Sequence, residues 1–295
     1  MLATETHVDR ELRTQPQLWR EAAGLEPQHR AGLPTAGASL AVLGSGTSWF
    51  IAMSYAVLRE RAGLGRTDAF ATSEFPIARD YDQVLVICRS GTTTEAVDVL
   101  RGLSGRIPTT VVTAVPDSPA AEAADRVIAL PFADEESVVQ TRFATTTLAL
   151  LRAHLGTDIE PIAREAETSM GIDVSALIGA QQCSFLGRGW TVGLAQEAAL
   201  KSREAAQFWA EAYPAMDYRH GPIAIAEPGR LVWALGDVPP GLEDEVTARG
   251  ATWVHHELDA MAALVVAQRF AVELALSRGL DPDHPRALTR AVVLE

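Results

Sequence analysis

Short strand-like runs alternate with longer helix-like stretches through the first half of this chain. Four runs are rich in apolar and β-branched residues and have the length of buried strands: residues 40–43, 84–88, 109–115 and 126–130. Three longer stretches have the composition and length of helices: residues 49–63, 95–103 and 141–155. Apolar strands that alternate with helices indicate a parallel sheet covered on both faces.

The same order of strand, glycine-rich turn and helix returns in the second half. A strand candidate at 183–186 precedes the turn, and a helix candidate follows at 192–210. Two more strands, at 231–235 and 252–255, and a helix at 261–278 complete the second pattern. This repeat is shorter than the first between residues 236 and 260, so we expect a trimmed sheet or a lost loop there.

The region before the first strand is different, because its polar sequence has only scattered apolar positions. Residues 4–30 predict a helical arm, which Gly32, Pro34 and Gly37 end. The sequence therefore predicts a helical N-terminal arm at 1–35, a first α/β domain at 36–160 and a second at 161–295. Two domains agree with a length of 295 residues.

Composition narrows the classes of function. The formal net charge is −13, which argues against broad nucleic-acid binding but leaves room for a small anion at a helix start. Cys88 and Cys183 lie in apolar runs, and no Cys/His cluster has zinc spacing, so we expect no metal ion and no cofactor. The N-terminus has no apolar signal core and no apolar stretch reaches spanning length, so we expect no membrane partner and a cytoplasmic protein.

Two turns of the first half carry the features of a phosphate site. The turn GSGTS (44–48) follows the first strand, and SGTT (90–93) follows the second. Each combines glycine, hydroxyl groups and the N-terminus of a helix. Ser, Thr and Gly are also ordinary helix caps and turn formers, but two such turns at the ends of neighbouring strands favour anion binding. Neither turn fits a nucleotide-binding motif.

The helix expected near 192–210 carries a charged stripe. Glu197, Lys201 and Glu204 are spaced i, i+4 and i+7, so they share one helix face among alanines. They form either a solvated pair or a partly buried stripe in which a carboxylate is tuned for proton transfer. His220 precedes a Gly-Pro break and should lie on a loop, where an imidazole can exchange protons near neutral pH.

These stretches resemble the double sugar-isomerase (SIS) domain family. The resemblance is to the isomerase half of glutamine–fructose-6-phosphate aminotransferase, to amino-sugar-phosphate deaminases and to tagatose-6-phosphate isomerases. The matching stretches, in the family's order, are GSGTS (44–48), CRSGTTTEA (88–96), QTRFATTTLALL (140–151), FLGRG (185–189), QEAALKSREAAQFWAEAY (196–213), RHGP (219–222) and DPDHPRALTRAVVLE (281–295). The implied fold is two tandem flavodoxin-like SIS domains, each a parallel sheet flanked by helices.

The resemblance also implies the roles of particular residues. The positions that match phosphate- or sugar-contacting residues are Thr47, Ser48, Arg89, Ser90, Gly91, Thr93, Val138 and Arg290. Glu204 matches the carboxylate that moves a proton between C1 and C2 of the sugar. His220 matches the ring-opening histidine, which in this family reaches the site of a neighbouring subunit, so a homodimer is implied.

Some positions depart from the family pattern. Arg89 stands where glutamine is usual, and Cys88 where a phosphate-binding serine is common. Arg290 replaces a lysine that forms a Schiff base, which a guanidinium cannot do. The second residue is Leu2 rather than a cysteine nucleophile, so we expect no glutaminase activity.

Three functions remain open at this point. The first is an enzyme that isomerises or deaminates an amino-sugar 6-phosphate by aldose–ketose proton transfer. The second is a deglycase of fructosamine 6-phosphates (Amadori adducts), which needs the same acid–base pair. The third is a phosphosugar-binding sensor without turnover, against which the retention of Glu204 and His220 argues.

Overall fold

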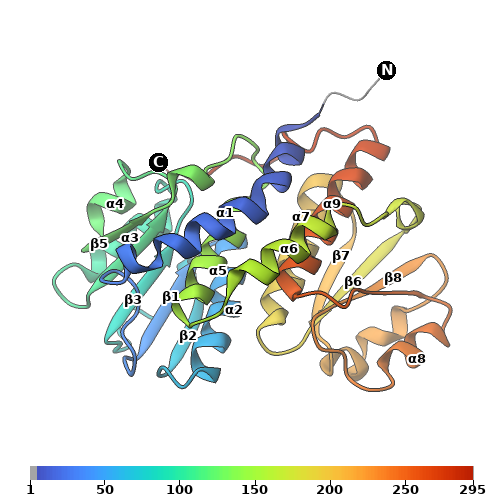
Figure 1. The fold of residues 1–295 in the computed structure, drawn as a ribbon, viewed down its shortest axis with the longest axis horizontal. Helices are drawn as coiled ribbons and strands as arrows, with labels where there is room; N and C mark the ends of the chain where they lie inside the picture. The colour runs from blue at the N-terminus through green and yellow to red at the C-terminus, as the bar shows by residue number, and fades with distance from the viewer. Residues whose placement is uncertain (1–4, 295) are drawn as a thin grey trace. The chain divides into compact units, whose positions relative to one another are not determined.

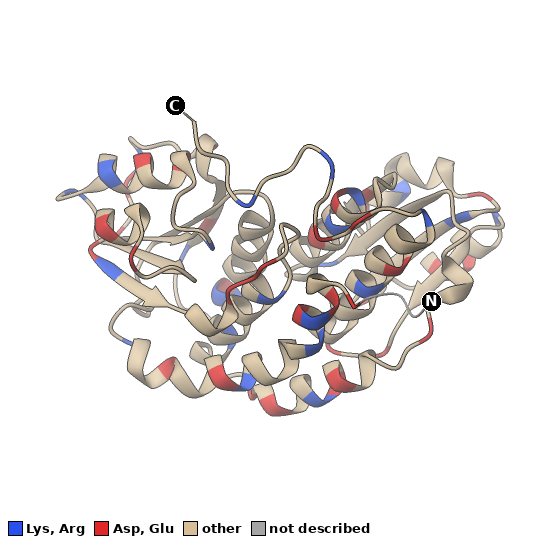
Figure 2. Cartoon of the chain, turned by 90° about the horizontal axis from the view of Figure 1, so that it is seen from above, with Lys and Arg blue, Asp and Glu red and all other residues tan. Residues whose placement is uncertain are grey.

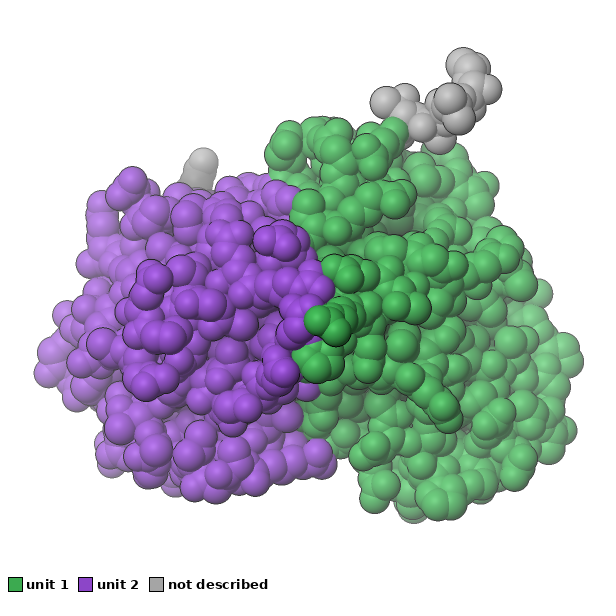
Figure 3. Space-filling model, in the orientation of Figure 1, with its two compact units in different colours: residues 1–16, 136–141, 161–288 green, residues 17–135, 142–160, 289–295 purple. Residues whose placement is uncertain are grey.

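The computed structural model describes residues 5–294, and these form two compact units (Figure 3). Unit 1 comprises the described residues up to Pro16, then Glu136–Thr141 and Pro161–Leu288. Unit 2 comprises Gln17–Glu135, Arg142–Glu160 and the described residues from Thr289 onward. Two helices have residues in both units, namely α1 (His7–His29) and α6 (Ile159–Ser169).

Unit 2 contains a five-stranded parallel sheet with the strand order β2-β1-β3-β4-β5 (Figure 1). Its strands are β1 (Leu40–Gly44), β2 (Thr67–Ala71), β3 (Gln83–Ile87), β4 (Thr109–Thr113) and β5 (Arg126–Ala129). Its helices after α1 are α2 (Thr47–Arg61), α3 (Thr94–Leu103), α4 (Pro119–Ala123) and α5 (Arg142–His154), with short 3-10 turns at Thr72–Glu74 and Pro131–Ala133. This order is that of a flavodoxin-like sheet.

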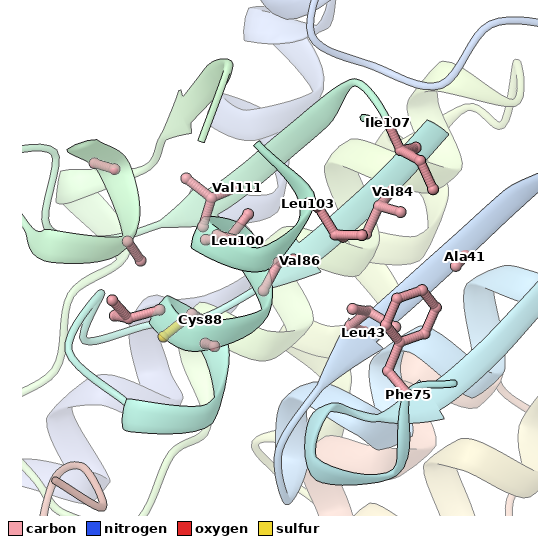
Figure 4. Packing of buried hydrophobic residues seen from close by; sticks show 14 of the residues in the cluster. Ala41, Leu43, Phe75, Val84, Val86, Cys88, Leu100, Leu103, Ile107 and Val111 are labelled. Atoms are coloured by element: carbon pink, nitrogen blue, oxygen red, sulfur yellow. The ribbon is translucent and has the colours of Figure 1, made fainter. Parts of the chain in front are cut away.

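Both faces of this sheet are covered, which explains why its central strands are apolar throughout. Helices α3 and α4 close one face through a buried cluster that includes Leu43, Val86 and Leu100 (Figure 4). Cys88 lies in the same cluster as a buried free thiol. Helix α2 packs on the other face, and α5 packs against α2.

Unit 1 repeats this plan with one strand fewer, in the order β7-β6-β8-β9. Its strands are β6 (Gln182–Gly187), β7 (Ala210–Pro214), β8 (Arg230–Leu235) and β9 (Thr252–His255). Its helices are α7 (Thr191–Ala206), α8 (Leu242–Thr247) and α9 (Ala260–Ser277), with 3-10 turns at Ser175–Leu177, η4 (Asp217–His220) and Pro222–Ile225. Of the two alternatives left open by the sequence, a trimmed sheet or a lost loop, the four strands of this sheet agree with the first.

The α/β fold class is confirmed, and the strands and helices expected from the sequence are present. Strands β2 and β7 were not predicted, and both are edge strands with mostly half-buried residues and no long apolar run. The units also differ from the predicted continuous domains, because α1 is divided at Pro16 and residues 289–294 belong with the first half.

Helix α9 changes one expectation about membranes. Among the described residues it is long and apolar enough to cross a bilayer by length and composition, although no such stretch was expected. Its residues are mostly buried within unit 1, as in the core helix of a soluble protein. Acidic and basic residues are interspersed along the outer helices (Figure 2).

Candidate functional site

The two hydroxyl-rich turns of unit 2 lie side by side. They follow β1 and β3, which are hydrogen-bonded neighbours with Gly44 opposite Ile87. The chain continues from β1 to β2 on one side and from β3 to β4 on the other, so the turns flank the topological switch point. Open α/β sheets bind ligands at this position. Ser45 Oγ also donates a hydrogen bond to Glu95 Oε1 at 3.1 Å and so connects the first turn to α3.

The turn after β1 is built around two glycines. A Cβ on Gly44 would lie 2.4 Å from the carbonyl carbon of Ser48, so a side chain is excluded where the strand turns into α2. Gly46 has φ 55° and ψ −124°, a conformation open to glycine. Thr47 and Ser48 then open the helix and are each 4% exposed.

The turn after β3 has the same character. Gly91 has φ 66°, and a Cβ there would lie 2.0 Å from Ser118 Oγ. Ser90 Oγ accepts a hydrogen bond from the Thr92 amide at 3.2 Å and lies 3.5 Å from Thr93 Oγ1. The hydroxyls of the two residues that the sequence predicts as ligands therefore lie next to each other.

The structure also bears on the alternative that these hydroxyls are ordinary helix caps. The N-cap of α2 is Gly46, which has no side chain, and Thr93, the N-cap of α3, makes no capping bond through its side chain. The hydroxyl groups of Thr47, Ser48 and Thr93 are thus not used for side-chain capping at these positions, which favours a ligand-binding role.

Arg89 and Arg290, the two arginines of unit 2 that depart from the family pattern, meet at one acidic segment. Arg89 is 5% exposed, and its Nη1 pairs with Glu135 Oε2 at 3.1 Å, while its Nη2 donates to the Arg290 carbonyl oxygen at 3.1 Å. Arg290 donates to the Glu135 carbonyl oxygen and pairs with Asp134. The structure therefore places both guanidinium groups on protein partners beside the second turn.

In unit 1 the charged stripe of α7 is largely buried. Lys201 is 1% exposed and pairs with Glu204, and its Nζ lies 3.7 Å from Glu197 Oε1. The side chain of Glu204 is 19% exposed, whereas that of Glu197 is fully buried. The solvated-pair alternative is excluded for Glu197 and Lys201, and Glu204 is the carboxylate of the stripe that reaches the surface.

Lys201 is also unique in this chain. Among the 25 Lys and Arg residues it is the one lysine, and all the others are arginine. An ammonium ion is compact and can give up a proton when its surroundings change, whereas a guanidinium stays charged and needs more room. The composition therefore marks the position between Glu197 and Glu204 as one that takes an ammonium ion.

His220 ends the 3-10 turn η4, whose neighbouring residues are firmly held. Tyr218 is fully buried, and burial raises the pKa of its hydroxyl to about 12. Arg219 donates from Nε and Nη2 to Glu245 at 2.9–3.1 Å and from Nη2 to the Pro240 carbonyl oxygen at 2.8 Å. His220 itself is exposed, so an anchored turn presents its imidazole at the surface of unit 1.

Val138, the predicted sugar contact, lies in unit 1 and is half-buried. Its amide donates to the Asp283 carbonyl oxygen at 3.4 Å. The neighbouring segment is fixed by Glu11, whose buried carboxylate accepts from the Glu136 amide at 2.5 Å and from the Ser137 amide and hydroxyl. Sequence reasoning missed Glu11 because an acidic residue on a helical arm has no local signal of burial.

The predicted residues thus form two groups, one in each unit. Unit 2 brings together Thr47, Ser48, Arg89, Ser90, Gly91, Thr93 and Arg290. Unit 1 holds Val138, Glu204 and His220. Glu135, which no sequence pattern singled out, contacts both Arg89 and Arg290.

No family model matches the chain, but individual proteins do. It is 30% identical, over 87% of its length, to a glutamine–fructose-6-phosphate aminotransferase (isomerizing) of Sulfolobus acidocaldarius. A protein of the same name from Lactiplantibacillus plantarum is 26% identical, also over 87% of the chain. The chain spans about half the length of these curated relatives.

Solved structures show the same fold over almost the whole chain. A glucosamine-6-phosphate deaminase of Thermotoga maritima has a TM-score of 0.85 at 23% identity and covers 98% of this chain and 100% of its own. A tagatose-6-phosphate ketose/aldose isomerase of Escherichia coli has a TM-score of 0.80 at 21% identity, with 97% and 98% covered. The C-terminal domain of the Francisella tularensis aminotransferase has a TM-score of 0.79 at 21% identity, with 96% and 99% covered. The resemblance stated from the sequence is confirmed.

Proposed function

We propose that this chain, which has the fold of the double sugar-isomerase-domain proteins, isomerises and deaminates an amino-sugar 6-phosphate. The observation that carries the proposal is the pair of adjoining turns at the switch point of the unit 2 sheet. The hydroxyls of Thr47, Ser48 and Thr93 in these turns do not cap helices. The chain as a whole has a net charge of −13, which repels phosphate, so a bound phosphate needs local donors such as these hydroxyls. Arg89 and Arg290 beside the second turn pair with Glu135 and Asp134, and Glu95 in the first turn of α3 adds a further carboxylate, so the charged side chains there do not make it positive. The donors for a phosphate are therefore the hydroxyls, the backbone amides and the helix N-termini.

Beyond phosphate binding, the reaction needs one acid–base group for ring opening and one for moving a proton from C2 to C1. His220 takes the proton of the ring hydroxyl and gives one to the ring oxygen, which opens the sugar. Glu204 then removes the proton from C2 of the open chain and returns it to C1. Through solvent, the C1 carbonyl oxygen gains the proton that the C2 amine loses as it becomes an imine, and water converts the imine to the ketone with release of ammonia. The phosphate acts as a remote handle that orients C1 and C2.

The single lysine limits how the sugar carbonyl can react. A Schiff base with a lysine side chain could form at Lys201 alone, because the chain has no other lysine. Lys201 is 1% exposed and its Nζ is paired with carboxylates, so the nitrogen is covered and already engaged within the protein. We therefore expect borohydride, added during turnover, to leave the mass of the Lys201 peptide unchanged. A reduced sugar adduct on that peptide would contradict the acid–base route.

The activity itself is tested with a panel of phosphorylated substrates. Glucosamine 6-phosphate and galactosamine 6-phosphate should release ammonia, and Glu204→Gln should lower kcat at least about a hundredfold. Glu227→Gln is the matched control, since the side chain of Glu227 is 56% exposed and pairs with Arg230. Release of an amino acid from fructosyl-amino-acid 6-phosphates would select the deglycase instead. Binding without any turnover, unchanged by Glu204→Gln, would select a sensor.

The proposed homodimer is tested by subunit mixing. If His220 acts in the site of the partner subunit, a dimer of one Glu204→Gln and one His220→Asn subunit contains one intact site and one doubly altered site. Random mixing of the two inactive variants then restores about a quarter of the activity, since about half of the dimers are mixed and each has one working site. No recovery in proven mixed dimers would place Glu204 and His220 of the same subunit together.

A further inference from the structure

Arg89 directly precedes Ser90 in the second turn, and its side chain contacts two other segments of unit 2. Its Nη1 pairs with Glu135 Oε2 at 3.1 Å, and its Nη2 donates to the Arg290 carbonyl oxygen at 3.1 Å. The other carboxylate oxygen of Glu135 accepts the amide of Arg142 at 2.7 Å, where α5 begins. Arg89 is therefore tied at once to the segment before α5 and to the C-terminal segment.

The C-terminal segment, residues 289–294, is fastened to the same turn from its other side. The Thr94 amide, in the first turn of α3, donates to the Val292 carbonyl oxygen at 3.1 Å. The Leu294 amide donates to Thr94 Oγ1 at 2.8 Å. Val292 and Leu294 are 56% and 67% exposed, so burial contributes little to holding this segment. Its position depends on these hydrogen bonds and on the arginine contacts.

We propose that Arg89 is a positioning residue, rather than a phosphate ligand, and that it fixes the C-terminal segment against the phosphate-binding turn. This rests on the proposed function only in taking Ser90 and Thr93 as the phosphate-binding hydroxyls. Arg89 and Arg290 depart from the family pattern together, and the structure joins both to Glu135. The guanidinium suits this task because its fork of donors reaches a carboxylate and a carbonyl group simultaneously.

The experiment uses hydrogen–deuterium exchange of the full chain, read on peptides covering residues 88–96 and 288–294. Arg89→Gln should speed exchange in both peptides about tenfold or more, because a charge-assisted contact is lost. Arg89→Lys keeps the charge but presents one nitrogen in place of two, so an intermediate rate is expected. Arg126→Gln, a change of an exposed arginine on β5, is the matched control and should leave both peptides at the wild-type rate.

Binding of inorganic phosphate separates positioning from direct contact. A positioning role predicts that Arg89→Gln binds phosphate within about threefold of wild type while exchange of residues 288–294 rises. A direct ligand role predicts a loss of at least about tenfold in phosphate affinity with unchanged exchange, and that result would overturn the proposal. If Arg89→Gln does not fold, the milder Arg89→Lys supplies the same two readouts, because it also removes the fork that reaches Glu135 and the Arg290 carbonyl oxygen together. These readouts need no turnover, so failure of the proposed reaction would be seen separately.

Discussion

Replacing Lys201 with methionine should lower the stability of the folded protein, because it removes the counter-ion of the buried carboxylate of Glu197 on α7. Methionine has a similar shape but no charge, so Glu197 loses the ammonium ion 3.7 Å from its Oε1. Glu197 is fully buried, and removing one partner of a buried pair costs about 3–5 kcal/mol. The contact with Glu204 adds about 0–1 kcal/mol, because that carboxylate is partly exposed to water.

This free energy corresponds to a measurable change in thermal stability. At about 2–4 °C per kcal/mol for a chain of this size class, the total of about 3–6 kcal/mol predicts that Lys201→Met lowers Tm by about 6–24 °C at pH 7.5. Without the ammonium ion, the buried carboxylate of Glu197 favours its protonated form in the folded variant. Its folded-state pKa then exceeds its pKa in the unfolded chain, so the stability deficit of the variant shrinks as the pH falls toward 5.

Circular dichroism melting at pH 7.5 and at pH 5 measures both effects. The double change Glu197→Gln with Lys201→Met removes the buried charges together and should recover most of the loss at pH 7.5. A Tm drop below about 2 °C, or an equal drop at both pH values, would refute the account of Lys201 as the counter-ion of a buried carboxylate.

Three further changes test other parts of the structure. Gly91→Ala places a Cβ 2.0 Å from Ser118 Oγ at φ 66°, so phosphate affinity in calorimetry should fall at least about tenfold and recover in part with Ser118→Gly. Burial, with a smaller contribution from its neighbour His255, lowers the pKa of His256, so its neutral form is favoured in the folded protein. Its contribution to stability, complete above about pH 6.5, is lost as the pH falls, so His256→Gln should flatten Tm against pH between 6.5 and 5 in melting curves. Arg59→Met removes a fully buried guanidinium that donates to four oxygen acceptors, so Tm should fall by at least about 4 °C, from about 1–3 kcal/mol for each acceptor left unsatisfied.

The sequence predicts those strands and helices whose own residues show a clear pattern of apolar and polar positions. Central strands such as β1 and β3 are apolar because both faces of their sheet are covered, and this shows in composition alone. The edge strand β7 has one neighbouring strand, and its sequence AEAYP has no long apolar run, so pattern analysis missed it. The division of α1 between two units depends on contacts distant in sequence, which no local rule contains.

The residues of the two turns could be predicted from the sequence, but the residues that hold the surrounding segments could not. Thr47, Ser48, Ser90 and Thr93 follow strands directly and stand before helices, so their place at the sheet edge could be inferred from order alone. The roles of Glu11 and Glu135 could not, because each becomes meaningful only when its carboxylate meets partners more than 40 residues away. The sequence also could not show that Glu197 is buried whereas Glu204 is partly exposed, because this difference depends on which side of α7 other elements cover.

The glycine turns after β1 and β6 have the same geometry, but we expect the first to bind phosphate and the second to stabilise the fold. Substitutions in the two turns can distinguish these roles. Gly187 repeats the geometry of Gly44, since a Cβ on it would lie 2.3 Å from the Thr191 carbonyl oxygen. In unit 1, however, the hydroxyl of Thr191 accepts the Arg188 amide at 2.8 Å and donates to the Leu235 carbonyl oxygen at 2.7 Å, so it serves the fold.

Thr191→Val should therefore cost about 2 kcal/mol or more, since it leaves buried backbone groups unsatisfied, and should leave phosphate affinity unchanged. Ser48→Ala should do the reverse, with a Tm within about 2 °C of wild type and a clear loss of phosphate affinity. Paired melting curves and phosphate titrations of the two variants measure this. If Ser48→Ala kept its affinity while Thr191→Val lost it, the ligand turn would lie in unit 1, and the placement of the phosphate in unit 2 would be wrong.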